Sequence, residues 1–72
     1  MITGEQVTEA RELLKWSIVD LVRWSGVSGI TILAFEIERQ RPEEGDVDKI
    51  QTALERAGVA FQEGAPLRLK GA

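Results

Sequence analysis

The chain has 72 residues, a formal net charge of −3, and neither cysteine nor histidine. This length suits one small domain with a limited core. Without cysteine there is no disulfide or thiolate metal site, and without histidine the commonest general base and transition-metal ligand are absent. We therefore expect no enzyme activity, no bound metal and no cofactor.

The sequence also carries expectations about location. No apolar run approaches the roughly 20 residues needed to span a bilayer. The first residues lack the basic and apolar segments of a secretory signal. We therefore expect a cytoplasmic protein that does not enter a membrane.

The first predicted helix covers about residues 4–15. Thr3 is suited to be its N-cap, with Gln6 as the partner in a capping box. Trp16, just beyond the helix, is predicted to pack under the junction with the next one. The apolar residues at helical spacing, which predict the buried face, are Val7, Ala10 and Leu14.

Two short helices are predicted next, joined by a tight turn at residues 25–27. Ser17 caps the first of them, with Asp20 at the reciprocal position. Gly26 can take the positive φ that a helix end requires, and Ser28 caps the following helix. This arrangement is a helix-turn-helix, the unit that places its second helix in the DNA major groove.

A loop at 39–45, containing proline and glycine, separates this unit from a fourth predicted helix. Asp46 is the expected cap of that helix, which covers about 47–57 and stops at Gly58. Its apolar stripe is regular, consisting of Val47, Ile50, Leu54 and Ala57.

The last segment alternates apolar and polar residues, which predicts two short strands at 59–62 and 67–70 with a turn at 63–66. The expected fold is mainly α, with four helices at 1–58 and a C-terminal pair of strands at 59–72 belonging to the same domain. A lone two-stranded hairpin is marginal in water, so the strands need support from the helices or from a second chain.

Three stretches of the sequence together follow a specific pattern. The pattern Met-Ile-Thr-Gly-x-Gln-x-x-x-Ala-Arg-x-Leu-Leu-x-Trp-Ser is matched from Met1 to Ser17. Ser-Gly-Val-Ser, Thr-Ile and Glu follow at 25–28, 31–32 and Glu36. Lys-Ile-x-x-Ala-Leu-Glu-x-Ala-Gly-Val-x-Phe is matched from Lys49 to Phe61. Over nearly its whole length the chain thus resembles the XRE family of Cro- and lambda-repressor-type regulators, especially a subgroup of short bacterial members.

The resemblance implies a lambda-repressor-like helical domain that binds double-stranded DNA and regulates transcription. It also implies an ion pair between Arg11 and Glu36. The DNA contacts that it implies lie at the caps, on the third helix and on the arginines after it. These candidates are Ser17, Ser28, Gly29, Ile30, Thr31, Leu33, Ala34, Arg39 and Arg41.

Several of these positions depart from the chemistry of base reading. Hydrogen-bond donors and acceptors are needed for bidentate contacts with base edges, and none of Gly29, Ile30, Leu33 and Ala34 supplies them. The family usually has glutamine where this chain has Ile18. The acidic balance, with a pI of about 4.9, also counts against strong nonspecific binding to DNA. Ser28 and Thr31 each have two open interpretations. Either residue could contact a base or a phosphate; otherwise Ser28 serves as a helix cap and Thr31 has a packing role.

The many apolar residues in the helix-turn-helix segment support an alternative function, a protein-interaction module on a helix-turn-helix scaffold. Large exposed apolar patches mark partner surfaces. Trp24 is either an interface anchor or a partly covered aromatic, and Val22 and Ile30 have the alternative of turning inward. We expect a homodimer, which would align two reading helices about 34 Å apart. The candidate interface residues are Ile18, Val22, Trp24, Ile30, Leu33 and Phe61.

Overall fold

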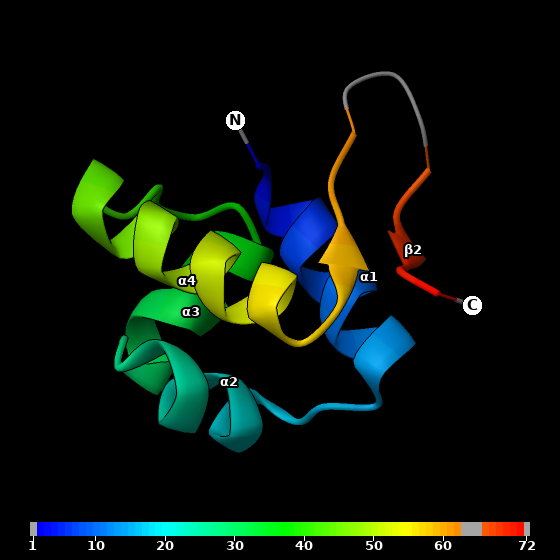
Figure 1. The fold of residues 1–72 in the computed structure, drawn as a ribbon. Coiled ribbons are helices and arrows are strands. Elements are labelled where there is room, and N and C mark those ends of the chain that lie inside the picture. Colours follow the sequence, from blue (N-terminus) through cyan, green and yellow to red (C-terminus); the bar gives the residue numbers. More distant parts are fainter. Residues whose placement is uncertain (1, 63–65, 72) are drawn as a thin grey trace.

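The computed structural model describes residues 2–62 and 66–71 and contains, within them, four helices followed by two short strands (Figure 1). In chain order they are α1 (Gly4–Leu14), α2 (Ile18–Ser25), α3 (Gly29–Glu36), α4 (Glu44–Arg56), β1 (Val59–Ala60) and β2 (Arg68–Leu69). The predicted mainly α fold with a C-terminal strand pair is therefore confirmed. The turn predicted at 63–66 lies largely outside the described residues.

Local side-chain bonds fix where the first two helices begin. Thr3 and Gln6 form the predicted capping box of α1, and Ser17 and Asp20 form the one of α2. Each box satisfies two backbone N–H groups that a helix start otherwise leaves without a partner. At the opposite end of α1, Lys15 adopts the left-handed conformation with a φ of 57°.

The start of α4 differs from the prediction. The helix begins at Glu44 rather than Val47, and its N-cap is Glu43, which makes no side-chain capping bond. Asp46 lies inside the first turn instead of capping it. Carboxylates in a first turn are favourable next to the positive end of the helix dipole, so this acidic run extends the helix towards its N-terminus.

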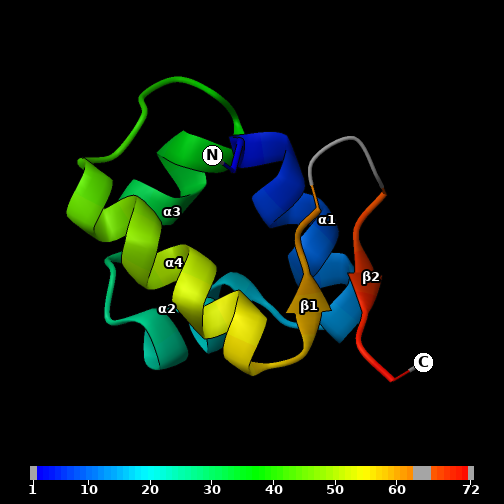
Figure 2. The same cartoon turned by 45° about the horizontal axis from the view of Figure 1, so that its top comes forward.

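One hydrophobic core unites the helices and the first strand. Its largest fully buried side chains are Leu21, Ile32, Ile50, Leu54, Val7, Val47 and Val59. The strands pair antiparallel, with Val59 opposite Leu69 and Ala60 opposite Arg68. Figure 2 shows β1 between α4 and β2, with both strands beside α1. The hairpin thus receives from α1 and α4 the support that an isolated pair of strands lacks.

The backbones of α1 and α3 meet very closely at Gly4. A Cβ atom added to Gly4 would lie 1.8 Å from the carbonyl oxygen of Phe35. Because the obstacle is backbone, a side chain at this position would force the two helices apart. Gly4 therefore sets how α3 sits on α1.

The helices are short. Within the described residues, no single helix has the length and apolar character to cross a membrane. The bent pair of α2 and α3 reaches the required length and apolar character only when the two helices are counted together.

Candidate nucleic-acid interface

The two short helices α2 and α3 have the geometry of a helix-turn-helix. They meet at 119° and are joined by the turn 26–28. Gly26 ends α2 with a φ of 74°, and Val27 is buried at 4% exposure between the two helices. The angle lies within the range of about 90–120° typical of this motif.

Three hydroxyl residues on this unit were predicted to contact DNA, and the structure shows how far each is already engaged. The Ser17 hydroxyl accepts from the Asp20 N–H at 3.2 Å. The Ser28 hydroxyl accepts from the Thr31 N–H at 3.2 Å and donates to the Thr31 hydroxyl oxygen at 2.9 Å. Because the two hydroxyls share one hydrogen bond, one hydroxyl hydrogen of the pair remains for another acceptor.

The outer face of α3 is apolar and open to solvent. Ile30 is 83% exposed, Leu33 is 51% exposed and Ile37, just after the helix, is 56% exposed. The spacing of these residues, by three and then four, places them on one side of the helix. We call Ile30, Leu33 and Ile37 the α3 stripe.

Other predicted residues face inward or sideways. A Cβ atom on Gly29 would contact Val22 and Ile18 at 3.5 and 3.6 Å, so Gly29 faces α2 rather than solvent. Ile18 and Val22 are half-buried against the core, as is Phe61. The predicted interface set is thus divided, because Ile18, Val22 and Phe61 already pack within the chain whereas Ile30, Leu33 and Trp24 are exposed.

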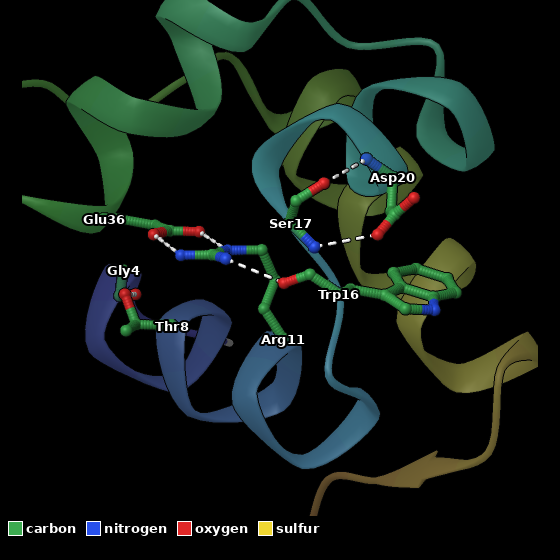
Figure 3. Close-up of polar contacts among 7 residues, drawn as sticks. All are labelled: Gly4, Thr8, Arg11, Trp16, Ser17, Asp20 and Glu36. Carbon is green, nitrogen blue, oxygen red and sulfur yellow. Dashed lines mark hydrogen bonds and ion pairs between the residues drawn. The ribbon is translucent and has the colours of Figure 1, made fainter.

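Arg11 is held by an ion pair under the helix-turn-helix (Figure 3). Its Nε and Nη2 atoms donate to the two Glu36 carboxylate oxygens at 2.6 and 2.8 Å, and Nη1 donates to the Trp16 carbonyl at 2.9 Å. The hydrogen bond with Glu36 is the main cause of a raised pKa of Arg11. This pair joins α1 to α3, as the family resemblance implies, and keeps Arg11 from acting on a phosphate.

The two arginines after α3 lie in different surroundings. Arg41 donates to the Ile2 carbonyl at 3.0 Å, and its guanidinium lies 5.3 Å from the Phe35 ring centroid. These contacts tie the loop to the segment before α1 and to the core. Arg39 is exposed and, among residues 2–62 and 66–71, makes no side-chain hydrogen bond or ion pair. It is the arginine with more freedom to reach a phosphate.

Carboxylates flank the α3 stripe at both ends. A shallow hollow beside Ile37 is lined by Glu5, Thr8, Glu9, Glu12, Glu36 and Glu38. Another hollow, beside Ile30, includes Glu43 and Asp46 in its wall. In the described part of the chain these acids form no group that could hold a metal ion. They oppose the approach of phosphates, so a DNA complex needs hydrogen-bond donors that offset this repulsion.

Sequence reasoning omitted Ile37 from the candidate residues. Its signal was the spacing of seven residues from Ile30 and four from Leu33, which continues the exposed side of the helix.

No protein-family model matches the chain, and no curated protein matches its sequence.

Proposed function

We propose that this protein is a small DNA-binding regulator of transcription, of the type that the XRE resemblance implies, which inserts α3 into the major groove. The observation that carries the proposal is the 119° arrangement of α2 and α3 with the α3 stripe left uncovered. In a helix-turn-helix the second helix enters the groove while the first crosses the backbone. The exposed start of α3 suits that placement.

The side chains on α3 suggest an unusual division of the contacts. Ile30 and Leu33 offer apolar groups that suit thymine methyls, and the remaining hydroxyl hydrogen of the Ser28–Thr31 pair suits a base or phosphate acceptor. Arg39 and the backbone N–H groups at the start of α3 suit phosphates. This set favours A·T-rich sites, with few directional contacts to bases.

Binding by a homodimer would compensate for a weak reading surface. Two copies would present two α3 helices about 34 Å apart, one turn of DNA. The phosphate and base contacts then double for one binding event. We therefore propose a homodimer on a pseudo-palindromic site.

The test is DNA binding by the purified protein over a range of salt concentrations. The duplexes are the region upstream of its own gene and a random sequence of equal length. We expect a preference for the upstream region, with the logarithm of the affinity falling linearly with the logarithm of the salt concentration.

Two variants sharpen this test. Arg39→Gln should weaken binding to all duplexes and lower the salt slope by about one, as expected for the loss of one phosphate contact. Arg68→Gln is the matched control, because Arg68 is exposed on β2, away from α3 in both views (Figures 1 and 2). Absence of binding by the parent protein even at low salt would overturn the proposal.

A second candidate function is docking of a protein partner on the α3 stripe. The favouring observation is that the stripe is apolar and has carboxylates at both ends. The complementary partner presents apolar side chains flanked by lysine or arginine. Under this alternative, DNA binding is absent, and Leu33→Glu abolishes a complex that light scattering detects with the parent protein. If Leu33→Glu leaves such a complex intact, the stripe is not its interface.

A further inference from the structure

A hollow of about 380 Å³ lies between α2 and the last two turns of α4, apart from the α3 stripe. Its lining consists of Trp16, Trp24, Ala53, Arg56 and Ala57. From this lining we infer that the hollow is a binding site for a small aromatic carboxylate. The volume falls at the lower end of the range found for small-molecule sites. The inference does not depend on whether α3 binds DNA.

Two indole rings form the wall of this site. Trp16 and Trp24 are stacked, with ring centroids 6.4 Å apart and an angle of 17° between their planes. Trp16 is half-buried against the core, and Figure 3 shows its ring on the side away from Arg11 and Glu36. Trp24 is 65% exposed, so much of its ring surface is available to a ligand. A planar aromatic ring is the group that stacks best on such a surface.

Small side chains on α4 leave the space that a ring would occupy. Ala53 and Ala57 are four residues apart and therefore lie on the same side of the helix. Both line the hollow, and neither has a side chain larger than a methyl group. Trp16 and Trp24 do not fill the hollow themselves, because they stack on one another.

The charges at the rim favour an anion. Arg56 lines the hollow and, within residues 2–62 and 66–71, takes part in no ion pair and no side-chain hydrogen bond. An adjoining hollow of about 290 Å³ shares Trp24, Ala53 and Arg56 with the first and adds Lys49 and Asp48 among its walls. Two basic side chains and one acidic side chain thus line the two hollows. Guanidinium groups bind carboxylates through paired, charge-assisted hydrogen bonds, so a carboxylate beside the ring completes the complementarity.

The chain contains two tryptophans, and both line the site, which provides a direct readout. The experiment is a titration of the full chain, labelled with nitrogen-15, with indole-3-acetate, followed by the two indole N–H signals in NMR spectra. We expect saturable shifts of both signals and of backbone signals in α2 and the end of α4. Indole-3-ethanol, which has the same ring without the charge, should bind about fivefold to tenfold more weakly, because the charge-assisted hydrogen bond is lost. Acetate, without a ring, should cause no saturable shift.

Two substitutions and a control assign the contacts. Trp24→Leu, at an exposed position, should weaken indole-3-acetate binding about tenfold through loss of stacking. Arg56→Gln should reduce the affinity for indole-3-acetate to that for indole-3-ethanol and leave the alcohol unchanged. The control Arg68→Gln removes an equal charge from β2 and should bind both compounds like the parent.

Three results would overturn the inference. The first is the absence of saturation with indole-3-acetate, and the second is equal affinity of the parent for the acid and the alcohol. The third is a shift of both indole signals with protein concentration alone, which would make a second copy of the chain the occupant of the hollow.

Discussion

The inner and outer faces of α3 both carry large apolar side chains, but they differ in burial and in contacts. On the inner face Ile32 is fully buried and Phe35 is 3% exposed, and Glu36 is held by Arg11. On the outer face Ile30 and Leu33 are exposed. The hydrophobicity of the side chains therefore does not distinguish the two faces of α3. Their contacts with the rest of the domain do. The inner face stabilises the domain, and the outer face is available for a partner.

The largest expected difference is between two neighbouring residues of this helix. Ile32→Ala should lower the free energy of unfolding by about 3–4 kcal/mol, because it leaves a cavity in the core. Leu33→Ser should change it by less than about 0.5 kcal/mol, since Leu33 is half exposed. Urea unfolding followed by circular dichroism measures both values. Similar losses for the two variants would refute the division of α3 into a structural and a free face.

Gly4 tests the contact between α1 and α3. Gly4→Ala should destabilise the domain by about 2–3 kcal/mol, because the new methyl group meets the Phe35 carbonyl and the backbones must separate. Gly45→Ala is the matched control in α4, where an added Cβ atom has no atom within 4 Å. It should be stabilising by about 0.5 kcal/mol through helix propensity. Equal effects of the two substitutions in thermal unfolding would show that the contact at Gly4 is not tight.

The ion pair tests the same contact by its chemistry. Arg11→Met should cost about 2 kcal/mol, because Glu36, with 6% of its side chain exposed, loses its partner. Adding Glu36→Leu to this variant should recover most of the loss, since an apolar pair needs no charge compensation. Arg23→Met, at an exposed position of α2, serves as the control for the same substitution outside an ion pair. Chemical unfolding of the four proteins forms the test, and a double variant less stable than Arg11→Met would contradict it.

A small effect is also expected at the start of α3. Gly29→Ala should raise stability by about 0.5 kcal/mol, because alanine favours the helix and its methyl group fits at 3.5 Å from Val22 and 3.6 Å from Ile18. Since this methyl group faces α2, the outer face should keep its binding properties. A lower melting temperature for Gly29→Ala would mean that α2 and α3 are packed more tightly than these distances indicate.

Much of the fold was predictable because its determinants are local. The capping boxes at Thr3 and Ser17 and the left-handed Gly26 each involve residues within three or four positions of one another. The start of α4 was not predicted, since its N-cap Glu43 makes no side-chain bond that a cap pattern would reveal. Asp46 has the residue type of a cap but lies within the helix.

The candidate site was less predictable, because it depends on contacts between residues distant in sequence. The bond from Arg41 to the Ile2 carbonyl spans 39 positions, and no local pattern indicates that it occupies this arginine. Composition likewise does not reveal that Ile18 and Val22 pack on the core while Ile30 remains exposed. The stacking of Trp16 on Trp24, which forms the wall of the hollow, also requires the folded chain.

The left-handed conformation of Lys15 has a counterpart at Glu38, whose φ is 58°. A residue with a Cβ atom in this conformation costs roughly 1–2 kcal/mol, which glycine would avoid. Within residues 2–62 and 66–71 the fold therefore has two positions at which it is less stable than it has to be. Proteins under selection for function retain such positions as long as the folded state stays above the stability that function requires. For an evolving domain they are a reserve, since glycine at either position would offset a destabilising change elsewhere in the chain.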